Sequence, residues 1–239
     1  MKTTLVHTIL IGVLAPATTL AATATATSVA TNGGSATATA NAVGRANANA
    51  YAGATNGGVA VADATAWGYG RAAADSNAIA LADRGLAVSR SRAVASGSRF
   101  GGARAVSDSV AATIGGVAIS RSDAIAQGRW GGWAESVSAS TATSFYGTAI
   151  SDSAALSHGR FGGRAVSVSD SLADAYGGRA TSRVRSVSGA SFGGRATADG
   201  IGISVSGAGR HSRANVRAVS RAHHWGRSVT RLSAVEVRP

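Results

Sequence analysis

Small side chains occupy every second position over most of the chain, from about residue 22 to about residue 222. In the segment 165–175, Ala or Ser stands at each odd-numbered position, with residues such as Val166, Val168 and Asp170 between them. Successive side chains of an extended strand point to opposite faces, so a period of two predicts β-strands and disfavours helices. The chain is therefore predicted to be all-β, with one face of every strand formed by the smallest side chains.

Glycine recurs along the same stretch at a nearly constant interval. Successive markers from Gly85 to Gly226 lie 14 to 17 residues apart, and shorter units precede them. Gly-Gly pairs supply the positive φ that a tight turn requires. A period this short predicts a solenoid of about 14 coils of 13–17 residues, each with two short strands and two turns. The predicted turn glycines are Gly101, Gly115, Gly131, Gly147, Gly162, Gly177, Gly193 and Gly209.

The cost of burying charge decides which face of the strands is inside. An unpaired Arg or Asp is far more expensive to bury than Val or Ile is to expose, so the Ala, Ser and Gly positions form the interior. Such small side chains let two sheets approach more closely than the usual distance of roughly 10 Å. The fold class is therefore a thin parallel β-solenoid or β-roll, in which like serines on neighbouring coils provide hydrogen-bond partners for one another.

The first residues have the pattern of a secretory signal peptide: Lys2 supplies a positive charge, Leu5–Leu14 an apolar stretch and Ala21 a small residue for cleavage. The apolar stretch is shorter than the roughly 20 residues of a spanning helix. We expect a signal peptide over 1–21, a solenoid over 22–225 and a basic C-terminal cap or tail over 226–239. The mature chain is expected outside the cell or on its surface, without a membrane span.

The glycine units resemble two families of exported repeat proteins. Segments such as GGRAVSVSDSLADAY and GGVAISRSDAIAQGRW resemble the left-handed β-roll head repeats of trimeric autotransporter adhesins, which also alternate small residues and return to glycine at a similar period. That resemblance implies a surface adhesin. The units are also similar to those of curlin-like functional amyloids, which implies strand-turn-strand subunits that polymerise outside the cell, as in a biofilm matrix.

Arginine carries nearly all of the positive charge. Of the 23 Lys and Arg residues only Lys2 is a lysine, and with 11 acidic residues the formal net charge is +12. Arginines that follow Gly-Gly pairs are expected to form a ladder along one edge, extended by others near the C-terminus. This candidate stripe comprises Arg164, Arg179, Arg195, Arg210, Arg213, Arg217 and Arg221. It fits anionic polysaccharide, lipopolysaccharide or extracellular DNA; the alternative is a solvated face that repels other copies and prevents sideways association.

Nothing in the sequence predicts catalysis, a metal site or a cofactor. The absence of cysteine excludes disulfides, thiolate metal sites and Cys nucleophiles. His223, His224 and Trp225 form a local cluster, but adjacent histidines of a strand face opposite sides and cannot chelate one ion together. The role of this cluster stays open, and the chain is not expected to be an enzyme.

Two functions remain. An unbranched solenoid has two open ends with unpaired strand edges, which favours a structural protein that assembles end to end with copies of itself into an extracellular filament or matrix. The alternative is a surface adhesin or an anionic-glycan-binding module, monomeric or trimeric.

Overall fold

The computed structural model describes residues 12–13, 21–31, 34–70, 72–99, 102–129, 133–160, 164–176, 178–190, 194–206, 211–222 and 226–237. These residues form strands joined by turns, and they contain no helix that is long and apolar enough to cross a membrane. The strands are β1 (Gly12–Val13), β2 (Ala21–Ala30), β3 (Ser35–Ala54), β4 (Val59–Gly70), β5 (Ala72–Asp83), β6 (Leu86–Arg99), β7 (Ala103–Ile114), β8 (Val117–Arg129), β9 (Trp133–Phe145), β10 (Thr148–Gly159), β11 (Arg164–Tyr176), β12 (Arg179–Ala190), β13 (Arg195–Ser206), β14 (Ser212–Ala222) and β15 (Arg227–Val237).

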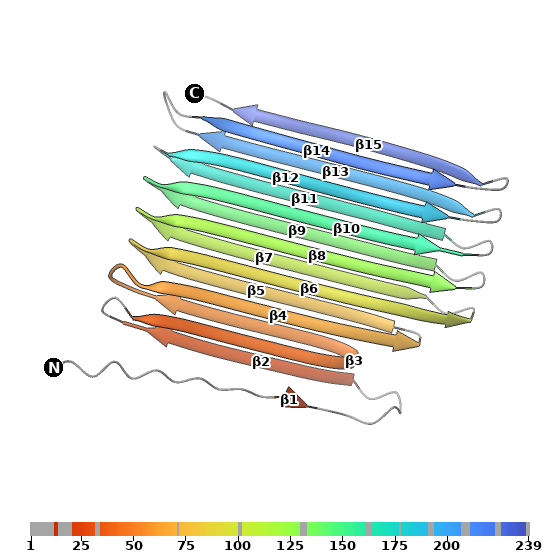
Figure 1. The fold of residues 1–239 in the computed structure, drawn as a ribbon, viewed down its shortest axis with the longest axis horizontal. Coiled ribbons are helices and arrows are strands. Elements are labelled where there is room, and N and C mark those ends of the chain that lie inside the picture. The colour runs from red at the N-terminus through yellow and green to blue at the C-terminus, as the bar shows by residue number, and fades with distance from the viewer. Residues whose placement is uncertain are drawn as a thin grey trace.

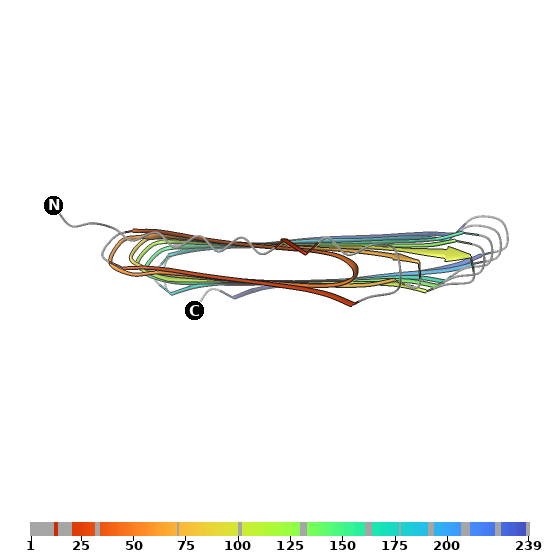
Figure 2. The ribbon, with the colours of Figure 1, turned by 90° about the horizontal axis from the view of Figure 1, so that it is seen from below.

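The strands lie in two flat layers that face each other (Figures 1 and 2). Every pairing is parallel, and the order is β14-β12-β10-β8-β6-β4-β3-β5-β7-β9-β11-β13-β15. We call the layer with β4 to β14 the even sheet and the layer with β5 to β15 the odd sheet. β3 belongs to both: its first part pairs with β4 and its second part with β5 and β2. The predicted thin, parallel, all-β solenoid is confirmed.

Each glycine-to-glycine unit is half a coil rather than a whole one. Thr148 of β10 lies beside Val117 of β8 and Arg179 of β12, so neighbouring strands of a sheet are 31 residues apart. One unit supplies a single strand of 12 or 13 residues and one turn. The number of coils is therefore about half of the 14 predicted, because the alternation continues through each unit without a second turn signal. Coils are shorter near the N-terminus, where Ser35 lies beside Val59.

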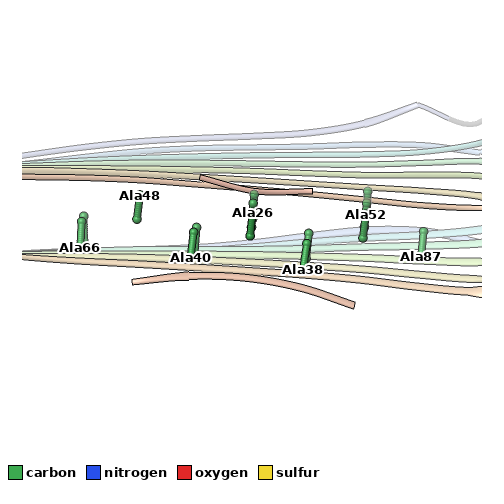
Figure 3. Packing of buried hydrophobic residues seen from close by; sticks show 14 of the residues in the cluster. Ala26, Ala38, Ala40, Ala48, Ala52, Ala66 and Ala87 are labelled. Atoms are coloured by element: carbon green, nitrogen blue, oxygen red, sulfur yellow. The ribbon is translucent and has the colours of Figure 1, made fainter. Parts of the chain in front are cut away.

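Alanine and serine fill the space between the sheets, as predicted. Ala48 and Ala52 of the odd sheet and Ala38 and Ala66 of the even sheet point toward one another (Figure 3) and are almost completely buried. β11 alternates between buried small residues and half-buried or exposed larger ones along its length. In β11 the charged side chains lie on the outer face.

Buried serines bind across the interior rather than along a sheet. The Ser76 hydroxyl donates to the Ala64 carbonyl oxygen at 2.7 Å, and the Ser89 hydroxyl donates to that of Ala78 at 2.6 Å; each bond joins the two sheets. Serines of neighbouring units do pair with one another as expected, but they do so across the interior, because the layers are close enough for a short side chain to reach the opposite sheet. One zigzag runs through Ser76, Ser91, Ser107, Ser122, Ser138, Ser153 and Ser169.

Two different demands explain the glycine pairs at the turns that lead from the odd sheet to the even sheet. The first turn position takes a positive φ, which is 71° at Gly115 but is also adopted by Arg84 (48°) and Tyr146 (61°). The second position is crowded: a Cβ at Gly147 would lie 1.8 Å from the Gly116 carbonyl oxygen. Gly115 therefore has the predicted role, whereas Gly147 is required by close contact between coils. The predicted turn glycines Gly101, Gly131, Gly162, Gly177, Gly193 and Gly209 lie outside the described residues.

Candidate interaction surfaces

The in-register stacking gathers arginines in the middle of the even sheet's outer face. Arg90 lies beside Arg121, and Arg185 lies beside Arg217 on the last strand of that sheet. Because outward residues of a strand are two positions apart, these side chains form two neighbouring columns. We call them the basic band, which consists of Arg90, Arg92, Arg121, Arg183, Arg185 and Arg217.

Acidic side chains neutralise only part of the basic band. Asp152 lies 3.8 Å from Arg121 and 4.0 Å from Arg183, and Asp63 lies 3.9 Å from Arg90. These arginine side chains are more than half exposed, so each pair contributes little to stability. Partial burial raises the pKa of Asp123, an effect that the nearby Arg92 opposes. Arg185 and Arg217 form no ion pair with a described residue, which leaves positive charge concentrated toward the C-terminal end.

The predicted arginine stripe divides into separate groups. Arg164 and Arg195 are in register at the start of odd-sheet strands, and Arg227 continues their column. Arg179 begins β12 in the even sheet, at the opposite lateral edge (Figure 1). The reason is that successive Gly-Gly turns lie at opposite edges when each unit is half a coil. Arg213, Arg217 and Arg221 follow one another along the outer face of β14, and Arg210 lies outside the described residues.

Acidic side chains gather in the middle of the odd sheet's outer face, while arginines lie nearer its margin and on β15. We call Asp75, Asp108, Asp170, Asp174 and Asp199 the acidic band. Partial burial, together with the Asp75 carboxylate, raises the pKa of Asp108; burial and Asp199 do the same to the pKa of Asp170. None of the five forms an ion pair with an arginine in the described part of the chain, whereas Glu135 lies 3.9 Å from Arg104 near the margin.

Among the described residues, no strand covers the C-terminal end of the solenoid. All residues of β15 are exposed, including Leu232, which points inward beside Gly200 yet is 53% exposed. The Arg227 N–H donates to the Gly194 carbonyl of the preceding coil at 3.1 Å, so the N–H groups of the alternate, inward-facing residues point to the open edge. Across this end, the Glu236 carboxylate accepts a hydrogen bond of 2.9 Å from the Ala214 N–H.

The N-terminal end is also open along much of its width. β2 pairs with β3 only, which leaves its other edge without a described partner. The even-sheet part of β3 is covered there by β1 at two positions, Asn41 and Ala42. The first interior positions of this end are alanines, among them Ala24, Ala26 and Ala36.

An aromatic groove lies on the odd sheet beside the turns. Phe145 and Tyr176 stack with ring centroids 5.0 Å apart, and Tyr146 meets the Phe145 ring edge-on at 4.4 Å. Leu81 and Ile114 line the rest of a shallow hollow of about 630 Å³. The rings lie over one another along the stack of coils, so packing at the edge of the sheet explains why they are there.

Metal-binding geometry does not arise in the described part of the chain, where no three His, Asp or Glu side chains gather. His223, His224 and Trp225 lie outside it.

Comparisons of the chain with protein-family models, with curated proteins and with solved structures give no match. The fold itself defines the class: the chain is a parallel β-solenoid repeat protein with an Ala/Ser interior.

Proposed function

We propose that this chain is the subunit of an extracellular fibre, in which the C-terminal end of one copy stacks on the N-terminal end of the next. The observation that carries the proposal is β15, an eleven-residue strand that is exposed along its whole length and whose outer edge pairs with no strand that the structure describes. Monomeric solenoids normally cover such an end with a polar cap. Here the inward Leu232 is left in solvent.

The strands at the two ends are similar in length. β15 has 11 residues and β2 has 10; β14 has 11, and the even-sheet part of β3 is paired over the matching span from Ser35 to Gly44. Coil lengths differ mainly in the turns. The alanines of the first coil also leave room for the larger inward side chains of the last one, Val216 and Leu232.

The predicted signal peptide bears on this interface, because β1 lies within it. Gly12 and Val13 cover the edge of β3 at Asn41 and Ala42. Cleavage near Ala21 would remove β1 and open that edge to β14 of another copy. Export and assembly would then be coupled through one proteolytic step.

Proline at residue 234 is expected to abolish fibre growth. The N–H of Ala234 points to the open edge, so Ala234→Pro removes a donor and adds a ring there without breaking a bond to β13. We expect the unmodified chain, residues 22–239, to form filaments with a repeat of about 4.8 Å along their axis. The variant should remain as short particles by negative-stain electron microscopy and light scattering.

Ala234→Ser is the matched control, because it changes the side chain and keeps the N–H. It should form filaments as the unmodified chain does. Filaments of unchanged length from Ala234→Pro would refute end-to-end stacking, and so would a monodisperse monomer from the unmodified chain at high concentration.

Removing the Glu236 carboxylate is expected to accelerate fibre growth. The carboxylate accepts a hydrogen bond from the Ala214 N–H, which lies at the open edge of β14. It also places an inward-pointing charge at the end of the solenoid, and such charges are a known way to prevent strand addition. Glu236→Ala should shorten the lag before filaments appear by about tenfold, if one edge hydrogen bond and one desolvation cost are relieved. Thioflavin fluorescence against time measures this; an unchanged or longer lag would contradict a protective role for Glu236.

The basic band supports a second candidate, a module that binds anionic glycans. Arg185 and Arg217 lie side by side and form no ion pair with a residue that the structure describes, an arrangement that an anion would stabilise. Retention on a sulfated-polysaccharide column that weakens steeply with salt, by a chain that stays monomeric, would favour this function over the fibre.

A further inference from the structure

The middle parts of the two broad outer faces of the solenoid differ in charge. Arginines of the basic band outnumber Asp63, Asp123 and Asp152 on the even sheet, while the acidic band dominates the middle of the odd sheet. The basic band runs along the stack of coils in two columns of in-register positions. The acidic side chains are more widely spaced: Asp75 and Asp199 lie in one column of the odd sheet and Asp108 and Asp170 in the next, with Val or Ala between them.

We propose that copies of this chain also stack face to face, with the basic band of one copy against the acidic band of the next. This layering is separate from end-to-end growth, since it uses the broad faces and no strand edge. In a fibre it would join neighbouring filaments side by side.

The positions of the bands agree with such a contact. Arg90 and Arg121 are the fifth residues of β6 and β8, and Asp108 is the sixth of β7, so the bands, apart from Asp174 near the end of β11, lie near the middle of their strands. Oppositely charged bands would therefore overlap when two copies are stacked flat. In this arrangement the aspartates of the acidic band, which form no ion pair within the described part of their own chain, face arginines of another copy.

Apolar columns flank both bands. On the even sheet the column contains Val61, Val88, Ile119 and Ile150; on the odd sheet it contains Tyr51, Ile79, Val110, Leu172 and Ile203. Strands of the two sheets run in opposite directions, so a simple translation of one copy along the sheet normal brings these two columns to the same side of the charged bands. Burial of the apolar columns would add a salt-independent attraction.

The available area is sufficient for a stable complex. A strand of 12 residues spans about 40 Å, and the distance from β4 to β14 is about 25 Å at 4.8 Å per strand. The face therefore offers about 1,000 Å², compared with about 800 Å² per partner in a typical stable interface. The contact joins two different faces and does not close on itself, so it produces open stacks rather than dimers.

A charge-exchange experiment tests the proposal. One variant reverses the even face (Arg90→Glu, Arg121→Glu, Arg185→Glu and Arg217→Glu), and the other reverses the odd face (Asp75→Arg, Asp108→Arg, Asp170→Arg and Asp199→Arg). Each variant alone has two faces of like charge and is expected to associate at least tenfold more weakly than the unmodified chain at low salt, by sedimentation velocity. An equimolar mixture of the two variants should regain association, because unlike faces again meet.

The measurement is made on the Ala234→Pro chain as well as on the unmodified chain, so that face-to-face stacking is observed without end-to-end growth. Circular dichroism confirms that each variant keeps its strands. A mixture that associates no better than either variant alone would overturn the proposal, as would association of the unmodified chain that does not weaken with salt. Single, unbundled filaments from the variants would leave end-to-end growth intact and show that the two contacts are independent.

Discussion

Replacing Gly147 by alanine is expected to lower the free energy of unfolding by about 3 kcal/mol, because the new methyl group has no space. Its Cβ would lie 1.8 Å from the carbonyl oxygen of Gly116, and the same collision recurs from coil to coil. The obstacle is backbone, which moves only if the coils separate. Separation would weaken the hydrogen bond of 3.0 Å from the Thr148 N–H to that carbonyl. The glycines stacked in this way are Gly58, Gly85, Gly116, Gly147 and Gly178.

Gly53→Ala is the matched control for the Gly147 prediction. A Cβ at Gly53 meets only the Tyr51 ring, at 3.7 Å, which is an ordinary contact. This substitution should be neutral or stabilise the chain by up to about 1 kcal/mol, since it restricts the unfolded state. Urea denaturation followed by circular dichroism compares the two. Equal midpoints for Gly147→Ala and Gly53→Ala would show that the contact between coils does not require glycine at the stacked positions.

Local alternation was sufficient to predict the fold and its interior, but not the length of a coil. A strict period of two determines which residues face inward, and the price of burying Asp170 or Arg164 determines the side. The glycine interval alone fits a coil of one unit or of two. Outward residues would have distinguished these coil lengths, because Arg90 and Arg121 lie 31 residues apart, which is the length of two units. Outward side chains vary more than inward ones, so this longer period is weak in the sequence.

The candidate surfaces were predictable only in part for the same reason. Arg164 and Arg195 form the expected column, since they are two units apart, whereas Arg179 is one unit away and lies at the other edge. The net charge of the whole chain also gives no sign that most acidic side chains lie on the odd sheet. The partners of buried serines such as Ser76 depend on the distance between the sheets, which no local pattern specifies.

The interior changes character near the C-terminal end, where Val replaces Ser. Val184 takes the inward place that Ser153 holds one coil earlier, and Val216 follows in register. Methyl groups at the facing positions of the odd sheet would collide with these valines and force the two sheets apart. The odd sheet compensates with Gly200 and Gly202, whose missing side chains leave room for the two valines.

Alanine at residue 202 is therefore expected to cost about 2 kcal/mol of unfolding free energy, and Val216→Ala in the same chain should recover much of it. A Cβ at Gly202 would lie 2.7 Å from Cγ2 of Val216 and 3.3 Å from the Ser182 Oγ. Because both valines are β-branched, they have few alternative rotamers and cannot move aside. The double-mutant cycle from urea denaturation should give a favourable coupling of about 1 kcal/mol or more.

The control pair combines Gly202→Ala with Val187→Ala. Val187 lies on the same strand as Val184 but points outward, away from Gly202, so the effects of these two substitutions on the free energy of unfolding should be additive. Additivity of Gly202→Ala with Val216→Ala would mean that the sheets separate locally at little cost, and the interior would then not set their spacing. Coupling would establish the opposite: the glycines of one sheet are matched to the bulk of the other. The spacing of this solenoid would then be fixed by pairs of facing positions, so that neither sheet's sequence can change alone.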